Sequence, residues 1–241
     1  MSVIVIIPAA GLGTRMAAAS GTRPPVSKQF AELGGVPVLV HTLRKFAAHP
    51  QVDEIYIALR PPEAGAFQER LSHEKLRKPL HVVEGGEHRQ ASVANALAAV
   101  RASAADLILV HDAVRPFVDA ETISSVIEAA ARYGAAIAAV PAVDTIKQVE
   151  RTAEGAVVRA TIPREQIVLV QTPQGFRFEV LKRAVEEASR DGFLGTDEAS
   201  LVERSGGEVA VVMGSPRNLK ITTPADLQLA EFYLEQEKQK A

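Results

Sequence analysis

The chain has 241 residues, of which 47% are hydrophobic and 23% are charged, as in globular proteins that bury a substantial core. Its formal net charge of -2 gives no general attraction to nucleic acid or to an anionic membrane, so an anionic ligand would have to meet a local cluster of Lys and Arg. The sequence contains no Cys, which excludes disulfides, thiolate nucleophiles and Cys-ligated metal sites. We therefore expect small anionic ligands, with no nucleic-acid and no membrane partner.

The apolar stretch at residues 3–10 predicts a buried strand rather than a targeting segment. It is much shorter than the roughly 20 residues of a membrane-spanning helix. No basic segment precedes it, as a secretion signal would require. Together with the absence of Cys, this predicts a cytoplasmic protein.

Short apolar runs recur along the chain, and most are followed by longer stretches with helical spacing. This order predicts a three-layer α/β domain. The first and fourth runs are apolar throughout, as expected for strands that are buried on both faces of a largely parallel sheet. Ligands should then bind at the carboxyl ends of the strands. The runs are residues 3–7, 55–59, 80–83, 107–110 and 135–140.

Several residues mark expected helix boundaries. Pro37 stands where a Pro is tolerated in a first helical turn, and Asp119 matches the N-cap pattern before the run at residues 123–133. Gly134 should end that helix. Farther along the chain we expect helices at residues 178–190 and 197–204, a strand at 209–213 and a closing amphipathic helix at 225–240.

Residues 143–170 differ from the rest of the chain. They alternate β-branched and polar side chains, lack helical periodicity and contain the turn-forming pair Glu154-Gly155. This pattern predicts a β-hairpin arm that leaves the sheet. No repeat or low-complexity linker interrupts the sequence, so we expect a single domain over residues 1–241 with the arm inside it.

A glycine-rich loop, PAAGLGTRM, follows the first strand directly at residues 8–16. Gly11 and Gly13 permit close approach of the backbone, whose amides could cradle phosphates, while Arg15 and Lys28 supply positive charge. The dinucleotide-binding fingerprint is incomplete, because Met replaces its third glycine. A P-loop is incomplete too, because no Gly-Lys-Ser/Thr follows. The alternative is a tight strand-to-helix turn with solvated basic residues.

A second polar cluster, HDAVRP at residues 111–116, stands at the end of the fourth apolar run. It places the Asp112 carboxylate and the Arg115 guanidinium where a parallel sheet opens onto its ligand crevice. Asp112 there would suit a hydroxyl or Mg²⁺, and the alternative is a local ion pair between Asp112 and Arg115. The six His residues lack metal-ligand spacing, so we interpret His111 as structural.

Taken together, these motifs resemble the 2-C-methyl-D-erythritol 4-phosphate cytidylyltransferases of the non-mevalonate isoprenoid pathway. The resemblance covers nearly the whole chain and follows the family's order. Its segments are PAAGLGTRM with Lys28, GGEHRQASV at residues 85–93, HDAVRP at 111–116, DTIK at 144–147, QTPQ at 171–174, TDEAS at 196–200 and NLKIT at 218–222. Such ordered agreement is specific, although each motif alone is not.

The resemblance implies a Rossmann-like nucleotidyltransferase fold and a Mg²⁺-dependent homodimer that is joined through the β-arm. It implies transfer of the cytidylyl group of CTP to 2-C-methyl-D-erythritol 4-phosphate, giving 4-diphosphocytidyl-2-C-methyl-D-erythritol and pyrophosphate. The phosphate of the acceptor would attack the α-phosphorus directly, so no protein nucleophile is required. A strong general base is not required either, because a phosphate monoester with a second pKa of about 6 is largely ionised at neutral pH.

Positions in the motifs also imply roles for single residues. The catalytic cations around the triphosphate are Arg15, Lys28 and Lys220. The nucleotide-binding positions are Ala9, Ala10, Gly11, Gly13, Gly86, Glu87 and Ser92, of which Ser92 could equally be a helix-face residue.

A further set of positions implies binding of the acceptor, a sugar-alcohol phosphate. Thr145 and Arg164 lie on the predicted arm and would hold the acceptor phosphate in the neighbouring protomer's site. Asp112 is in addition the candidate metal ligand. The positions that match binding of the acceptor hydroxyls are Asp112, Arg115, Thr172 and Thr196.

Two alternatives to this function remain open. Ribitol-5-phosphate cytidylyltransferases share the nucleotide loop and the HDAVRP segment, although Lys147 and the Pro8-Ala9-Ala10 opening favour methylerythritol phosphate. A catalytically silent regulatory or scaffold protein could use the same fold, but the joint retention of the basic residues and of Asp112 argues against it. Residues 17–25 form a longer segment than is usual in the family.

Overall fold

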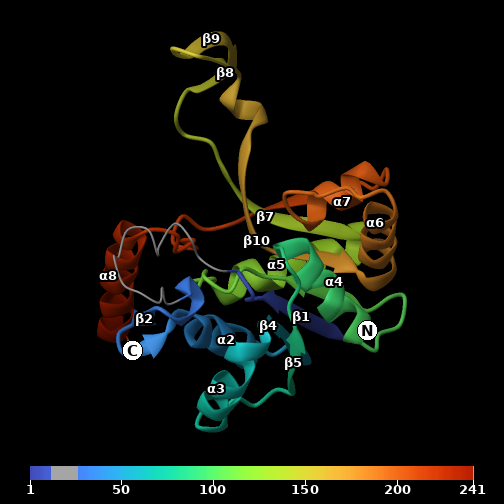
Figure 1. The fold of residues 1–241 in the computed structure, drawn as a ribbon, viewed down its shortest axis with the longest axis vertical. Coiled ribbons are helices and arrows are strands. Elements are labelled where there is room, and N and C mark those ends of the chain that lie inside the picture. Colours follow the sequence, from blue (N-terminus) through green and yellow to red (C-terminus); the bar gives the residue numbers. More distant parts are fainter. Residues whose placement is uncertain (12–26, 241) are drawn as a thin grey trace.

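The computed structural model describes residues 1–11 and 27–240 and has a seven-stranded sheet at its centre (Figure 1). The strand order is β11-β7-β10-β6-β1-β4-β5, and β10 runs antiparallel to both of its neighbours while the other pairs are parallel. The mostly parallel α/β sheet is thus confirmed. The strands are β1 (Val3–Pro8), β4 (Glu54–Leu59), β5 (Leu80–Glu84), β6 (Leu107–Val110), β7 (Ala135–Pro141), β10 (Val168–Arg177) and β11 (Ala210–Met213).

Helices cover both faces of the sheet, because successive side chains of a strand point to opposite faces. Val5 and Ile7 of β1 pack with α2, α3 and α5, whereas Ile4 and Ile6 pack with α4, α6 and α7. All four side chains are at most 1% exposed, as the continuous apolar run predicted. The helices are α2 (Val38–Ala48), α3 (Pro61–Ser72), α4 (Arg89–Ala99), α5 (Ala120–Tyr133), α6 (Phe178–Arg190), α7 (Glu198–Arg204) and α8 (Pro224–Lys240).

Most of the predicted boundaries are confirmed to within a residue or two. The expected strand at 107–110 and the expected helix at 178–190 are reproduced as β6 and α6. Asp119 caps α5, because its Oδ1 accepts a 2.7 Å hydrogen bond from the backbone N–H of Thr122. Gly134 ends α5 in the left-handed conformation, with a φ of 91°.

Other details differ from the prediction. Pro37 lies at the N-cap of α2 rather than in its first turn, because it pairs with Glu32 in a small hairpin of β2 (Glu32–Leu33) and β3 (Val36–Pro37). Residues 168–170, predicted as part of the arm, belong to β10 and pair with β7. The expected amphipathic helix is α8, but it also exposes Leu229 and Phe232, at 41% and 52%.

The predicted arm is a two-stranded hairpin that projects from the sheet (Figure 1). In it, β8 (Ile146–Thr152) pairs antiparallel with β9 (Gly155–Ile162), and a 3-10 turn, η2 (Arg164–Gln166), leads on to β10. Nearly all side chains of β8 and β9 are exposed. The hairpin therefore gains little stability from packing against its own domain.

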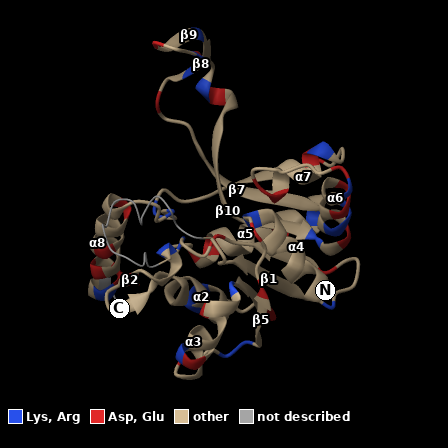
Figure 2. Ribbon diagram, viewed as in Figure 1, with Lys and Arg blue, Asp and Glu red and all other residues tan. Residues whose placement is uncertain are grey.

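Charges of both signs are mixed over the surface. Figure 2 shows Lys or Arg residues next to Asp or Glu residues along α6 and α8, in keeping with the small net charge. Within residues 1–11 and 27–240, no helix combines the length and the apolar character that crossing a membrane requires.

Substitution of two glycines by alanine should have opposite effects on stability. Gly134 has a left-handed backbone, whereas Gly65 lies inside α3 where an added Cβ meets no atom within 4 Å. We expect Gly134→Ala to lower the free energy of unfolding by about 1 kcal/mol, and Gly65→Ala to raise it by up to about 1 kcal/mol. Urea denaturation of both variants measures the two effects. A Gly134→Ala variant as stable as the wild type would contradict the capping role of Gly134.

Candidate active site

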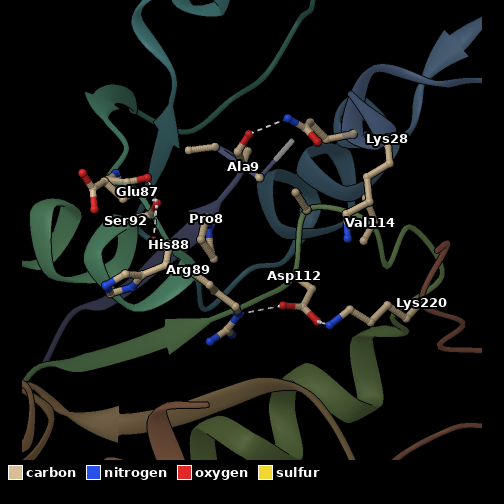
Figure 3. Close-up of a pocket in the computed structure, with 15 residues that line it drawn as sticks. Pro8, Ala9, Lys28, Glu87, His88, Arg89, Ser92, Asp112, Val114 and Lys220 are labelled. Atoms are coloured by element: carbon tan, nitrogen blue, oxygen red, sulfur yellow. Dashed lines mark hydrogen bonds and ion pairs between the residues drawn. The ribbon is translucent and has the colours of Figure 1, made fainter. Parts of the chain in front are cut away.

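A pocket opens at the carboxyl ends of β1, β5 and β6, between the loop after β1 and the start of α4 (Figure 3). We name it the nucleotide pocket. It gathers most of the residues that were predicted to contact CTP, while Gly13 and Arg15 lie outside the described residues. The predicted residues that line it are Ala9, Ala10, Gly11, Lys28, Gly86, Glu87, Ser92, Asp112 and Lys220.

Close packing between two loops shapes the floor of the nucleotide pocket. A Cβ on Gly85 would lie 2.3 Å from the Cβ of Ala10, and one on Gly86 would lie 2.4 Å from the Cβ of Ala91. Real Cβ atoms do not approach so closely, so only glycine allows the β5–α4 turn to pack against the loop after β1. At Gly11, in contrast, a Cβ would meet no atom of the described residues within 4 Å.

Lys28 is held at the nucleotide pocket by its neighbours in sequence. Gln29 is 2% exposed, and its Nε2 donates a 2.7 Å hydrogen bond to the carbonyl of Ala9. The Ser27 hydroxyl donates to Glu63 Oε1 at 2.8 Å and accepts from Arg60 Nη2 at 3.0 Å. Contacts on both sides therefore hold the 3-10 turn η1 (Lys28–Phe30), while the long segment at residues 17–25 lies outside the described residues.

A second pocket, which we name the acceptor pocket, adjoins the first. Arg89, Asp112 and Lys220 line both pockets. The four residues that were predicted to bind the acceptor hydroxyls, Asp112, Arg115, Thr172 and Thr196, all line it, together with Gln171, Gln174 and Asp197.

Asp112 is the centre of an ion-pair network that joins the two pockets (Figure 3). Its Oδ1 lies 3.1 Å from Arg89 Nε, and its Oδ2 lies 2.8 Å from Lys220 Nζ and 3.5 Å from Arg115 Nε. Burial alone would raise the pKa of the Asp112 carboxyl, but the charges of Arg89, Lys220 and Arg115 outweigh that effect and hold the pKa well below its ordinary value. Asp112 is therefore ionised at neutral pH.

The network extends inward to a second carboxylate. Glu198, at the start of α7, accepts hydrogen bonds from Arg89 Nη1 at 2.7 Å on each of its oxygens. Burial raises the pKa of Glu198, and the charge of Arg89 opposes the rise. Two carboxylates and three cations thus meet between the pockets.

Comparison with known proteins places this site in a family. The chain matches the IspD family, 2-C-methyl-D-erythritol 4-phosphate cytidylyltransferase, over residues 3–236. The protein of that name from Acidobacterium capsulatum is 60% identical over 236 residues, with 98% of each chain covered. The one from Solibacter usitatus is 51% identical over 238 residues, covering 98% of this chain and 97% of the relative. A crystal structure of the Thermus thermophilus enzyme aligns with a TM-score of 0.75 at 37% identity, covering 98% and 100% of the two chains.

The chain belongs to the IspD family. It is accordingly a nucleotidyltransferase, and the resemblance inferred from its motifs is confirmed over the whole domain.

The IspD fold keeps the two arm residues apart from both pockets. Thr145 and Arg164 line neither pocket, and the arm that carries them points away from the sheet (Figure 1). Arg164 Nη1 instead donates a 2.8 Å hydrogen bond to the carbonyl of Val143, within the arm. Contact of Thr145 and Arg164 with an acceptor stays a prediction. It requires that these residues reach the acceptor pocket of another protomer rather than the one in their own chain.

Some side chains that line the IspD pockets are already engaged. The Ser92 hydroxyl accepts a 3.1 Å hydrogen bond from the backbone N–H of Gly86 and donates to the carbonyl of His88 at 3.1 Å. Ser92 therefore holds the glycine turn, the helix-face role that the sequence left open. Its contact with the nucleotide stays a prediction.

Sequence patterns gave no role to several residues of this network. Arg89 and Glu198 lie in matched motifs, but only the fold brings them within hydrogen-bond distance, since 109 positions separate them. Asn218 is fully buried, and its side-chain Nδ2 donates to the carbonyl of Thr172 at 2.7 Å, while its side-chain oxygen Oδ1 accepts no hydrogen bond within the described structure. The sequence signal that could have identified Arg89 is its position as a basic residue in the first turn of a helix, at the helix end that faces the crevice.

The residues around Asp112 do not form a metal site of their own. Each oxygen of Asp112 contacts a cation, and the same positive charges would repel a metal ion. Within the ranges 1–11 and 27–240, no group of three His, Asp or Glu side chains could hold a metal ion. The prediction of Asp112 as a metal ligand does not fit this arrangement.

A closed chain of hydrogen bonds holds the Asp112 loop. The carbonyl of Arg115 can only accept, so His111 Nε2 carries the proton in their 3.1 Å contact and Nδ1 is the acceptor. The Thr172 hydroxyl then donates to Nδ1 at 3.1 Å and accepts from the backbone N–H of Asp112 at 3.0 Å. When His111 is neutral, every group in this series of hydrogen bonds has a partner, as a structural role of His111 predicted.

Protonation of His111 should therefore destabilise this IspD domain in mild acid. Burial lowers the pKa of His111 to about 4 from an ordinary 6.5. The hydrogen bond to the Arg115 carbonyl and the charge of Asp112 oppose this shift, while the charges of Arg115 and Arg89 act in the same direction as burial. The cost is absent above pH 6.5, grows as the pH falls, and reaches about 3 kcal/mol below pH 4. Urea denaturation from pH 7 to pH 4 should show a steeper loss of stability for the wild type than for His111→Asn, which cannot titrate. Equal slopes would contradict this origin of the acid sensitivity.

Proposed function

We propose that this chain transfers the cytidylyl group of CTP to 2-C-methyl-D-erythritol 4-phosphate, releasing pyrophosphate and 4-diphosphocytidyl-2-C-methyl-D-erythritol. The observation that carries the proposal is the junction of the two pockets at Arg89, Asp112 and Lys220. A transferase must hold a donor and an acceptor with their reacting atoms next to each other. Here a pocket whose floor is formed by glycine turns and whose lining includes Lys28 and Lys220 meets a pocket lined by hydroxyl, amide and charged side chains.

In this mechanism the acceptor phosphate attacks the α-phosphorus of CTP, a new P–O bond forms, and the bond to the leaving pyrophosphate breaks. No protein nucleophile takes part. Negative charge accumulates on the phosphorus and on the leaving group, so cations close to both lower the barrier. We assign this role to Lys28 and Lys220, which line the nucleotide pocket, and to Arg15, which lies outside the described residues.

Asp112, ionised by its three cations, would accept hydrogen bonds from the hydroxyls of the acceptor, and Thr196 and Arg115 would complete that pocket. A divalent cation, with Mg²⁺ as the family's implied ion, would neutralise charge on the triphosphate. Since the described carboxylates do not provide a metal site, the triphosphate itself and water would hold the ion.

The exposed side chains of the arm favour a homodimer. A two-stranded hairpin with nearly all side chains exposed is at best marginally stable in water. It also exposes Val149, Val157 and Val158, each by 47–55%, and the adjoining start of β10 exposes Leu169 by 53%. Packing against a second protomer would cover these side chains and would carry Thr145 and Arg164 to the acceptor pocket of the partner. We expect the dimer to work in the cytoplasm.

Pyrophosphate release from CTP and Mg²⁺ tests the proposed reaction, with methylerythritol phosphate or ribitol 5-phosphate supplied separately. We expect release with methylerythritol phosphate alone, and a turnover at least ~100-fold lower for Lys28→Ala with an unchanged far-UV spectrum. Release with ribitol phosphate alone would show that the proposed acceptor is wrong, while the proposed cytidylyl transfer would stand. Release with neither would favour a silent scaffold on this fold.

Subunit mixing tests the role of the arm. Arg164→Ala and Lys28→Ala protomers should each be nearly inactive as homodimers. In a mixed dimer one of the two sites combines wild-type Lys28 with wild-type Arg164 of the other protomer, so activity should return to a substantial fraction of one wild-type site. The fraction of mixed dimers is verified with two affinity tags. Verified mixed dimers without recovered activity would contradict a site shared between protomers.

A further inference from the structure

Glu198 is the most deeply buried carboxylate at the site, and the proposed reaction does not use it. It is 1% exposed, against 6% for Asp112, and it lines neither pocket. Both of its oxygens accept hydrogen bonds from Arg89 Nη1 at 2.7 Å. A carboxylate buried this deeply is costly unless it is paired, so its presence ties Arg89 to α7.

Arg89 stands between two carboxylates and uses a different atom for each. While Nη1 binds Glu198, Nε lies 3.1 Å from Asp112 Oδ1. The three residues come from the start of α4, the start of α7 and the end of β6. The orientation of the guanidinium at the junction of the pockets is thus set by a residue that lies behind it.

We propose that Glu198 is a positioning residue for the acceptor: it holds the Arg89 guanidinium so that Arg89 contacts Asp112 only at Oδ1, through one N–H, and Asp112 can still accept hydrogen bonds from substrate hydroxyls. This inference rests on the proposed function, because it takes Asp112 to be the acceptor-binding carboxylate. Without Glu198, the guanidinium can turn and bind both Asp112 oxygens with its parallel N–H groups, the arrangement that Arg favours with a carboxylate. Asp112 would then be withdrawn from the acceptor.

A charge argument separates this role from simple electrostatics. The network has one positive charge more than its carboxylates neutralise. Neutralising Glu198 makes it more positive, which by Coulomb attraction would favour a phosphorylated acceptor. Weaker acceptor binding in a Glu198→Gln variant would therefore reflect lost positioning, since the change in charge acts the other way.

The test is steady-state kinetics of Glu198→Gln with both substrates varied. We expect the KM for methylerythritol phosphate to rise by about tenfold or more, while the KM for CTP changes by less than about twofold, because Glu198 does not line the nucleotide pocket. Glu203→Gln is the matched control, since Glu203 is exposed on the same helix, and it should leave both constants unchanged. Glu198→Asp, which keeps the carboxylate but shortens its reach, should be intermediate.

A purely structural role of Glu198 would give another result. It would lower the amount of active enzyme while both KM values stayed at wild-type levels, and that outcome overturns the proposal. If Glu198→Gln does not fold, Arg89→Lys is tested in its place, because the ammonium of Lys cannot bridge two carboxylates on opposite sides as the guanidinium does. An unchanged KM for the acceptor in Arg89→Lys would overturn the proposal equally. The wild-type assay with each acceptor reports on the proposed function separately. If the wild type is active only with ribitol phosphate, the KM comparison is made with that acceptor. If it is active with neither acceptor, the result contradicts both the proposed function and the role of Glu198.

Discussion

The site depends on keeping one carboxylate ionised inside the protein. Asp112 is buried at the end of β6, where loss of hydration disfavours its charge, and it remains an anion because Arg89, Lys220 and Arg115 surround it. These cations come from α4, from the segment before α8 and from the loop after β6. Their common partner couples three separate parts of the chain. A shift of any one of them would remove part of the positive charge that keeps the buried Asp112 ionised, which costs more than the loss of a surface ion pair.

The sheet explains why two pockets meet at this carboxylate. Parallel strands end at one edge, which brings the loops after β1, β5 and β6 together and forms the nucleotide side. The acceptor side depends on β10, which is inserted antiparallel between β6 and β7. Because Gln174 pairs with Val110, the last residue of β6, the residues just before Gln174 extend past the same edge. The reversed strand thus delivers Gln171 and Thr172 to the acceptor pocket and connects it to the arm.

Much of this could be predicted from the sequence, for definable reasons. Continuous apolar runs identified β1 and β6, and the Asp119 and Gly134 caps bounded α5, because such signals are local. The ordered motifs also identified most of the pocket-lining residues. What the sequence could not reveal was long-range. The start of β10 reads like the arm beside it, since neither has helical periodicity, and only pairing with β7 separates them. The pairing of Arg89 with Glu198, and the hydrogen bond between Thr172 and His111, likewise exist only once distant segments meet.

The two pockets are constrained by different kinds of force, and this bears on selectivity. The nucleotide side is set by excluded volume, since Gly85 and Gly86 tolerate no Cβ and Gln29 clamps the carbonyl of Ala9. Such a surface is rigid, and it suits a donor common to all cytidylyl transfers. The acceptor side is set by charge and hydrogen bonds among side chains from several elements. Methylerythritol phosphate and ribitol phosphate differ in chain length, in a methyl branch and in the number of hydroxyls. If the acceptor binds as proposed, discrimination between them would arise at Asp112 and its neighbours, which would contact the hydroxyls, because a polar group left unpaired in a buried site is penalised more heavily than a missing methyl group.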